Sequence, residues 1–325
     1  ATPPEMLIPL IKARRAVLVG DHRQLPPVFT FGAKMSQEER EVDPERAKRL
    51  DNLFSPQNKD RFQNMVTASI FEQWFKRANP QIRQRLNFQY RMHHDISSLV
   101  NRFYNFQLKD GWPVDEEETA KKHGLTVCGI GGEAVIRLDC HAYWFDSSRN
   151  RQGDPCYSSR RSGSTSQENI YEADAVLALL EKVNQIYLQS PDDTSSISVG
   201  VISFYKDQIQ RIGNAVRKRK FKAIDVEVST VDANQGKEKN IIFVSMVSNT
   251  PEKRATDFIR QFERMNVAFS RARNLLVIFG AAELFREQSV YLPNMDTDGG
   301  TEKQIYKNMI QQLQGADAFW PCWEL

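Results

Sequence analysis

The chain has 325 residues, of which 40% are hydrophobic and 26% are charged, and its formal net charge is +3. These values predict an ordinary globular protein with one large core or two smaller ones. They exclude nucleic-acid binding through a strong overall positive field, so any such surface must be a local patch. No apolar run approaches the roughly 18 residues of a membrane span, and the four cysteines are widely spaced without a C-x-x-C pair. We therefore expect an intracellular protein, cytoplasmic or nuclear, with no membrane partner, no disulfide framework and no cysteine-bound metal.

Short apolar runs along the chain predict buried strands. These runs are residues 16–19, 199–202, 226–229, 241–247 and 275–279. Apolar side chains recur at helical spacing in residues 167–186 and again after Lys206, which predicts two amphipathic helices. Strands that alternate with helices are typical of a parallel α/β sheet.

Two stretches interrupt this alternation and are predicted to be insertions or loops. Residues 31–64 are dense in charge, and residues 108–166 hold clusters of glycine, serine and arginine. Within the second stretch, residues 129–134 (Gly-Ile-Gly-Gly-Glu-Ala) fit a dinucleotide-binding pattern. Strand-like residues follow them, however, where such a site requires a helix. A glycine hairpin is therefore the better prediction.

The first candidate motif follows the first predicted strand. Residues 20–27 read Gly-Asp-His-Arg-Gln-Leu-Pro-Pro and lie beyond the strand's carboxyl end, where ligands collect in open α/β sheets. Gln24 could orient a water molecule or a γ-phosphate there. The segment is explained equally well as a polar turn closed by two prolines.

The second candidate motif pairs an aromatic ring with a guanidinium. Tyr90 and Arg91 lie within residues 86–96, ahead of a helix that is predicted to run to about Phe106. A tyrosine ring can stack on a base, while an arginine can bind phosphate through two parallel hydrogen bonds. The alternative is a tyrosine and an arginine that only pack at a helix start.

Two further motifs lie in the second half of the chain. Residues 229–238 form a turn between two predicted strands, where backbone amides beside Gly236 can approach phosphate and Glu238 can accept hydrogen bonds from a ribose. Residues 264–273 predict a helix that runs into a strand, with Arg271 near the helix end. An arginine there can stabilise charge in phosphoryl transfer, or it can be a solvated residue favoured by the helix dipole.

Taken in order, these four motifs resemble the later motifs of superfamily one helicases, in the subfamily of the regulator-of-nonsense-transcripts and senataxin-like helicases. The matching segments are Gly-Asp-x-x-Gln-Leu-Pro-Pro, Gln-Tyr-Arg-Met, Thr-Val-Asp-Ala-x-Gln-Gly-x-Glu and Asn-Val-Ala-x-Ser-Arg-Ala. The resemblance covers about residues 1–284 apart from the insertions. It implies a RecA-like parallel sheet with helices on both faces, the P-loop NTPase fold. Residues 1–84 would be the tail of a first RecA-like domain, and residues 85–325 a second one with an insertion at about 108–166.

The resemblance also implies roles for individual residues at a nucleotide site. Gln24 would contact the γ-phosphate or the attacking water, and Arg91 and Arg271 would be two phosphate-sensing arginines. Tyr90 would stack on adenine, amides beside Gly236 would approach phosphate, and Glu238 would bind the ribose.

A second set of residues is implied for the nucleic acid. Ser203 and Tyr205 lie in a segment that resembles the family's strand-contact loop, and Ser203 and Thr230 would hydrogen-bond the nucleic-acid backbone. Such contacts do not depend on base sequence. A basic cluster at residues 217–222 could form a strand-guiding rim, although a solvated helix end is the commoner role of such a cluster.

The chain carries no Gly-x-x-x-x-Gly-Lys-Ser/Thr loop and no acidic pair for magnesium, both of which an ATP-driven motor needs. We expect a preceding RecA-like half of the native protein to supply them. The expected cofactors are ATP and Mg2+, with the metal ligands in that half. The expected partner is single-stranded nucleic acid, DNA or RNA, with translocation from 5′ to 3′, and this chain alone is expected to be inactive. The alternative is a non-catalytic nucleic-acid-binding module that retains the helicase fold.

Overall fold

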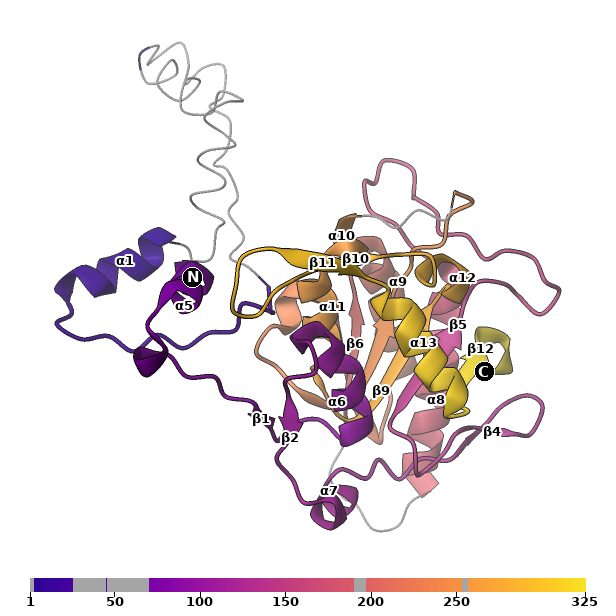
Figure 1. Cartoon of the computed structure of the whole chain (residues 1–325). Helices are drawn as coiled ribbons and strands as arrows, with labels where there is room; N and C mark the ends of the chain where they lie inside the picture. Colours follow the sequence, from indigo (N-terminus) through magenta and orange to yellow (C-terminus); the bar gives the residue numbers. More distant parts are fainter. Residues whose placement is uncertain (1–2, 26–44, 46–69, 190–196, 253–256) are drawn as a thin grey trace. The chain divides into compact units, whose positions relative to one another are not determined.

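The computed structural model describes residues 3–25, 45, 70–189, 197–252 and 257–325. The chain divides into two compact units, unit 1 over Ala1–Arg85 and unit 2 over Leu86–Leu325. Each unit is described by itself below. Figure 1 shows the helices and strands along the chain.

Unit 1 does not contain the strand that was predicted at residues 16–19. Its described elements are helices α1 (Pro3–Lys12) and α5 (Ile70–Arg77) and the 3-10 turn η1 (Pro80–Ile82). Val17 and Val19 are 90% and 86% exposed. A parallel strand is held by the strands beside it, and the described residues of unit 1 include no other strand, so this prediction is wrong. The predicted insertion at 31–64 lies outside the described residues, apart from Glu45.

Unit 2 is built on one six-stranded, fully parallel sheet with the order β12-β5-β9-β8-β6-β7. The strands are β5 (Ala142–Asp146), β6 (Ile197–Ser203), β7 (Ile224–Thr230), β8 (Lys239–Ser245), β9 (Ala272–Gly280) and β12 (Phe319–Pro321). The predicted strands at 199–202, 226–229 and 275–279 are confirmed, and the one at 241–247 ends at Ser245. The middle strands are buried on both faces, which is why they appear in the sequence as unbroken apolar runs.

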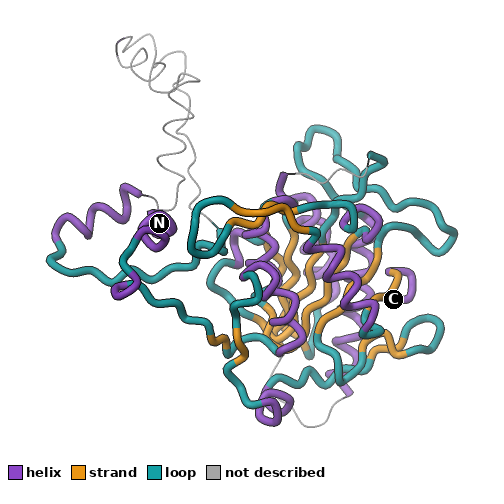
Figure 2. Tube along the Cα trace, in the orientation of Figure 1, coloured by secondary structure: helices purple, strands orange, loops and turns teal. Residues whose placement is uncertain are grey.

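Helices cover both faces of this sheet (Figure 2, helices purple and strands orange). Helices α8 (Ile170–Gln189) and α9 (Lys206–Arg219) pack on one face, against β6 to β9. On the opposite face α6 (His94–Val100) contacts β9, α11 (Phe262–Phe269) contacts β8, and α13 (Ile305–Gly315) contacts β5. Connections between parallel strands are right-handed. The chain moves one way along the sheet from β5 to β7 and the other way from β8 to β12, so the helices of these two parts lie on opposite faces. The predicted α/β arrangement of a RecA-like domain is thereby confirmed.

The segment at 108–166 is not a simple insertion, because part of it belongs to the sheet. Strand β5 lies between β12 and β9, and its Tyr143 and Trp144 are fully buried. The rest of the segment holds β2 (Lys109–Asp110), α7 (Val114–Ala120) and an antiparallel hairpin of β3 (Val127–Cys128) and β4 (Ala134–Ile136). The predicted glycine hairpin is therefore confirmed, and the prediction of an insertion is wrong for residues 142–146.

The first helix after Arg91 is shorter than predicted. Helix α6 ends at Val100 and continues as the 3-10 turn η2 (Asn101–Tyr104), after which Asn105 and Phe106 adopt positive φ angles of 51° and 61°. The remaining elements are β1 (Phe88–Gln89), η3 (Asp232–Asn234), α10 (Asp257–Arg260), α12 (Ala282–Phe285), β10 (Val290–Pro293), β11 (Gly300–Lys303) and η4 (Cys322–Glu324). Among the described helices, none has the length and apolarity that crossing a bilayer requires.

A shared ion pair fastens the start of α8 to α9. The carboxylate of Glu168, which is 4% exposed, lies 2.5 Å from Nη2 of Arg161 and 2.8 Å from Nε of Arg211. The two guanidinium groups lower the pKa of Glu168 to about 2. Because the folded state holds the ionised carboxylate, its stabilisation is complete above the ordinary pKa and disappears as the pH falls toward 2.

We therefore expect Glu168→Gln to lower the free energy of unfolding by about 2 kcal/mol at pH 7, after allowance for solvent screening of the partly exposed arginines. Urea unfolding at pH 7 and pH 3 measures the difference between the two proteins. The difference in the free energy of unfolding should be smaller at pH 3, because part of the stabilisation by the ionised carboxylate is lost there. An equal difference at both pH values would show that the ion pair is not what stabilises this junction.

Candidate nucleotide and nucleic-acid site

Arg91, Glu238 and Arg271 come together at one end of the sheet, although Arg91 and Glu238 are 147 positions apart. Glu238 immediately precedes β8 and Arg271 immediately precedes β9, and the amide of Lys239 donates to the carbonyl of Arg271 (3.1 Å). Nε of Arg91 lies 2.8 Å from Oε2 of Glu238, and Arg273 lies 3.4 Å from Oε1 of the same carboxylate. Two guanidinium groups thus share one carboxylate, and Arg271 adds a third positive charge nearby, which leaves an excess of positive charge suited to phosphate.

Gln89 organises the turn that carries Tyr90 and Arg91. Its Oε1 accepts the amide protons of Arg91 (3.0 Å) and Met92 (2.8 Å), and its Nε2 donates to the carbonyl of Met92 (2.9 Å). The Arg91 side chain then reaches Glu238 and donates to the carbonyl of Ser270 (3.1 Å). Tyr90 remains 58% exposed, so its ring is accessible for stacking.

Arg271 is placed differently from Arg91, because its guanidinium is only 1% exposed. Nε donates to the carbonyl of Val267 (2.9 Å), Nη1 to the carbonyl of Lys237 (3.2 Å) and Nη2 to the hydroxyl of Ser270 (3.0 Å). The side chain therefore joins the end of α11 to the connection that leads into β8. A phosphate can reach Arg271 only if some of these contacts are exchanged.

Gly236 lies in the connection between β7 and β8, with a φ of +85° that favours glycine. The preceding turn is fixed by Asn234, which is 2% exposed, donates to the carbonyl of Thr230 (3.2 Å) and contacts the hydroxyl of Ser229. Asn234 thus acts inside the turn, and its amide group is not presented to a ligand. The connection runs from the carboxyl end of β7 to the amino end of β8.

The predicted nucleic-acid residues lie at the opposite, carboxyl end of the sheet. Ser203 ends β6 and pairs in register with Thr230 at the end of β7. Ser203 is fully buried and its hydroxyl donates to the carbonyl of Ser245 (2.9 Å), while Tyr205 is 6% exposed and its hydroxyl lies 2.9 Å from that of Ser248. The three residues are thus brought together, but only Thr230 has a partly exposed side chain. Contacts by Ser203 and Tyr205 would have to come from their backbone.

The basic cluster at residues 217–222 lies away from that end. It falls at the carboxyl end of α9, which returns to the amino end of the sheet before β7 begins. Arg219 is paired with Glu181 of α8. This position does not fit a rim beside Ser203 and Thr230, and it fits a solvated helix end.

A buried carboxylate near the carboxyl end was not predicted. Glu172 of α8 is fully buried, and it accepts hydrogen bonds from the hydroxyls of Ser147 (2.8 Å) and Ser245 (2.7 Å) and from the amide of Val247 (2.8 Å). Burial raises the pKa of Glu172 to about 7. Val247 has a φ of +66°, a strained conformation for a β-branched residue. Glu172 therefore holds the strained turn that brings Ser248 to Tyr205. The sequence signal was an acidic residue on the apolar face of a helix.

Gln24 belongs to unit 1 and lies in a turn held by Asp21. Nε2 of Gln24 donates to Oδ2 of Asp21 (3.0 Å), and Oδ1 of Asp21 accepts the amide of Arg23 (2.9 Å). The ring of Phe71 from α5 packs against Gly20, where a Cβ would lie 3.1 Å from the ring. The turn is thus locally ordered, and Gln24 is half-buried in it. Pro26 and Pro27 lie outside the described residues.

Four histidines cluster near the Tyr90–Arg91 turn without forming a good metal site, namely His93, His94, His123 and His141. Among the described residues, ligand atoms come close enough for an ion in two groups, His93–His94–Glu117 and His93–Glu118–His141. The ring centroids of His93 lie 3.4 Å from those of His141 and 4.1 Å from those of His94. Two imidazoles bound to one ion through nitrogen hold their ring centres about 5 Å apart. The rings are therefore stacked as packing groups, and burial lowers the pKa of His93 to about 2 so that this ring is neutral.

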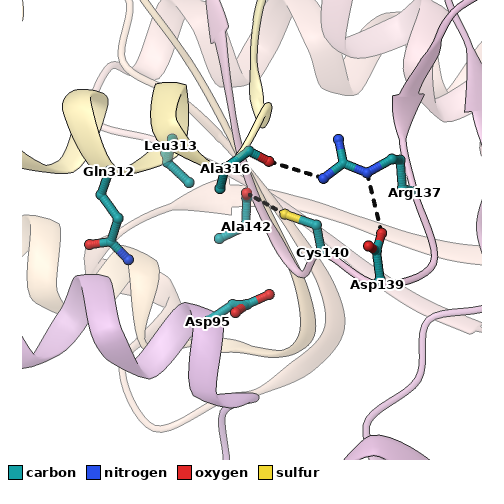
Figure 3. Close-up of a pocket in the computed structure, with 8 residues that line it drawn as sticks. All are labelled: Asp95, Arg137, Asp139, Cys140, Ala142, Gln312, Leu313 and Ala316. Carbon is teal, nitrogen blue, oxygen red and sulfur yellow. Dashed lines mark hydrogen bonds and ion pairs between the residues drawn. The ribbon is translucent and has the colours of Figure 1, made fainter.

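A pocket lies apart from all these residues, where the start of α6 meets residues 137–142 and the end of α13 (Figure 3). Arg137 donates to the carbonyl of Ala316 (3.0 Å) and lies 3.3 Å from Asp139. None of the predicted site residues lines it. Arg137 thus ties this segment to α13, and the pocket is not part of the candidate site.

The chain is similar in sequence to known proteins. A family model described as an AAA domain matches residues 66–283, and a second model with the same description matches residues 1–30. The chain is therefore an AAA-type domain protein with a RecA-like fold. It belongs to the superfamily one helicases of the Sen1-like type and corresponds to their C-terminal portion.

Three relatives illustrate the match. An uncharacterized ATP-dependent helicase of Methanocaldococcus jannaschii is 26% identical over 96% of this chain and 39% of its own length. The helicase sen1 of Schizosaccharomyces pombe is 28% identical over 88% of this chain and 14% of its own. The DNA replication ATP-dependent helicase/nuclease DNA2 of Xenopus laevis is 28% identical over 93% of this chain and 26% of its own. The chain thus spans less than half the length of these relatives.

A solved structure of the PRRSV helicase also matches. It is 9% identical and covers 73% of this chain and 34% of its own, with a TM-score of 0.23. This value is too low for a comparison of the two folds in detail.

Proposed function

We propose that this chain supplies the second RecA-like lobe of an ATP-dependent helicase or translocase on single-stranded DNA or RNA, moving from 5′ to 3′. The observation that carries this proposal is the gathering of Arg91, Glu238, Arg271 and Arg273 at the amino ends of β8 and β9. In this proposal Arg91 and Arg271 sense the phosphates of ATP and Glu238 binds its ribose.

The charges at this end support an exchange of partners on nucleotide binding. Glu238 is held by Arg91 and Arg273, and its side chain is 41% exposed. Arg91 and Arg273 can exchange the Glu238 carboxylate for phosphate oxygens, which also accept paired hydrogen bonds from a guanidinium group. Glu238 is then free to accept hydrogen bonds from ribose hydroxyls, and the exposed Tyr90 ring can stack on the base.

The residues of unit 2 fit ATP better than they fit its metal. Among the described residues Glu238 is the carboxylate that pairs with Arg91 and Arg273, and these two guanidinium groups already neutralise it. Magnesium needs oxygen ligands that are free of such cations. We therefore assign the Mg2+ ligands and the phosphate-cradling loop to a preceding RecA-like half, with Gln24 contributing from unit 1. Bound Mg2+ would neutralise phosphate charge during transfer.

The other end of the sheet is proposed to hold the strand. Thr230 and the backbone around Ser203 and Tyr205 would contact phosphates and sugars, so binding would not depend on base sequence. Opening and closing of the two lobes would change these contacts and move the strand. The four cysteines are free thiols, which supports an intracellular setting, cytoplasmic or nuclear.

Arg91→Ala tests this function in the full-length protein. ATP hydrolysis stimulated by single-stranded nucleic acid should fall about a thousandfold, as on loss of an arginine finger. Strand binding without nucleotide should not change. The matched control is Arg219→Ala, which breaks another exposed arginine–glutamate pair, with Glu181 of α8, at the carboxyl end of α9, and which should leave both quantities unchanged.

Three outcomes would contradict the proposal. Unchanged hydrolysis in Arg91→Ala would remove Arg91 from the site. A full-length protein that binds single strands but hydrolyses no ATP would instead be a non-catalytic binding module with the helicase fold. Measurable turnover by the 325-residue chain alone would contradict the need for a first lobe.

A further inference from the structure

Lys121 is buried at the back of the Tyr90–Arg91 turn. It is 2% exposed, although lysine is rarely buried in proteins. Its Nζ donates to the carbonyls of Tyr90 (2.9 Å) and Arg91 (2.6 Å), two consecutive residues of one predicted motif. Lys121 itself follows α7, in the segment whose sequence predicted only an insertion.

Trp112 completes the same arrangement from the other side of that segment. Its Nε1 donates to the carbonyl of Tyr90 (2.7 Å), so this carbonyl accepts two hydrogen bonds. The ammonium of Lys121 lies 5.4 Å from the centre of the Trp112 ring, within the range of a cation–π contact. The Tyr90 and Trp112 rings meet edge to face at 6.5 Å. Lys121, Trp112 and Tyr90 thus form one connected unit, which we call the carbonyl clamp.

Burial of this ammonium is costly, which makes its position informative. Desolvation lowers the pKa of Lys121, and Arg273 and Arg91 lower it further while Glu117 and Glu238 raise it. No carboxylate among the described residues hydrogen-bonds Nζ, which donates to the two carbonyls. An apolar residue would fill the same space without the desolvation penalty. The role of the buried ammonium therefore lies in the two backbone carbonyls that it anchors.

The carbonyl clamp sets the directions of the Tyr90 and Arg91 side chains. Anchored carbonyls fix the peptide planes that follow Tyr90 and Arg91, and these planes set where both side chains point. The Tyr90 ring also lies directly on Gly111, where a Cβ would come within 2.3 Å of the ring. The ring is thereby turned outward, and the guanidinium of Arg91 is turned toward Glu238.

We propose that Lys121 is a positioning residue of the nucleotide site, with Trp112 as its support. It holds Tyr90 and Arg91 where they meet the base and the phosphates of ATP. This inference rests on the proposed function, because it assigns a role toward a nucleotide held by Tyr90 and Arg91. Lys121 itself would contact neither the base nor the phosphates of ATP.

Lys121→Met in the full-length protein tests the inference. Methionine has a similar length and keeps an apolar contact with Trp112, but it cannot donate to either carbonyl. The KM for ATP in single-strand-stimulated hydrolysis should rise about tenfold or more, as expected for the loss of two charged hydrogen bonds. The control is Lys122→Met, which changes the exposed neighbouring lysine and should leave KM and kcat unchanged.

A double substitution separates positioning from stability. Because Lys121 acts in part through Tyr90, its effect on KM should be clearly smaller in a Tyr90→Ala background, since coupled residues are not additive, and the remaining effect should come from Arg91. A merely structural lysine would lower the active fraction, and with it kcat, at an unchanged KM. That result would overturn the inference. If Lys121→Met does not fold, Trp112→Phe removes only the indole donor, and an unchanged KM in that variant would also overturn it.

The two proposals fail in different ways. If the unmutated full-length protein hydrolyses ATP and the KM of Lys121→Met is unchanged, only the role of Lys121 is wrong. If the unmutated full-length protein neither binds nor hydrolyses ATP, the proposed function is wrong and the role of Lys121 is wrong with it.

Discussion

Arg271→Ala in the full-length protein is expected to lose both activity and stability. Single-strand-stimulated ATP hydrolysis should fall about a thousandfold or more if Arg271 stabilises the charge of phosphoryl transfer. The same substitution leaves the carbonyls of Val267 and Lys237 and the hydroxyl of Ser270 without their buried donor. Each lost partner costs about 1–3 kcal/mol, so the free energy of unfolding should fall by several kcal/mol. Arg91→Ala should lose activity with little change in stability, because that side chain is partly exposed.

Arg271→Lys separates these two effects. Lysine keeps the positive charge but cannot reproduce the planar fork that contacts three acceptors at once. We expect it to recover part of the stability and little of the hydrolysis rate. Urea unfolding and single-turnover hydrolysis measure the two quantities. A rate that falls only in proportion to the unfolded fraction would show that Arg271 is structural.

Glu172 is expected to make stability depend on pH in an unusual direction. Its pKa is about 7 in the folded protein against an ordinary value of 4.5. The folded state therefore binds a proton more tightly than the unfolded state does, and stability falls as the pH rises from about 4.5 to above 7. At pH 8 the ionised, buried carboxylate costs up to about 3 kcal/mol.

Glu172→Gln should remove this dependence. The amide oxygen can accept from Ser245 and Val247, and the amide nitrogen can donate to the hydroxyl of Ser147, so every buried partner stays satisfied. The variant should be more stable than the original protein at pH 8 and closely similar at pH 5. Glu172→Ala leaves a cavity and three unpaired donors, and should cost about 2–4 kcal/mol. Urea unfolding between pH 5 and pH 8 gives these values, and parallel pH profiles for the original protein and Glu172→Gln would contradict the assignment.

The sequence predicted strands β6, β7, β8 and β9 of the sheet and missed the two neighbouring strands β5 and β12 on its other side. A strand such as 275–279 is covered on both faces, so its burial requires an unbroken apolar run. Residues 16–19 show the same pattern but form no strand, because a pattern does not supply the neighbouring strands that hold it. Strand β5 was missed because its five residues lie among charged and glycine-rich segments. β12 was also missed, since a three-residue edge strand is too short to show a pattern.

The sequence predicted which residues form the candidate site, but it did not predict how their side chains are oriented. Motif spacing identified Arg91, Glu238 and Arg271, and the fold brings them together. It could not show that Arg271 is buried on carbonyls, or that the Ser203 hydroxyl points into the sheet, because side-chain direction depends on packing with distant strands. Lys121 was not predicted at all. A lysine beside several acidic residues is ordinarily a solvated charge, and only the fold shows which carbonyls it meets.

The two sides of the arginine cluster differ in stiffness. Glu238, Arg271 and Arg273 are spaced by the register of β8 against β9 in the middle of a six-stranded sheet, so that side cannot shift without breaking the ladder. Tyr90 and Arg91 follow a two-residue strand whose only pairing is with another two-residue strand. The sheet therefore sets the positions on the first side, whereas the positions of Tyr90 and Arg91 depend on the hydrogen bonds from Lys121 and Trp112. We therefore expect loss of the Lys121 and Trp112 contacts to displace Tyr90 and Arg91, while the spacing of Glu238, Arg271 and Arg273 stays constant.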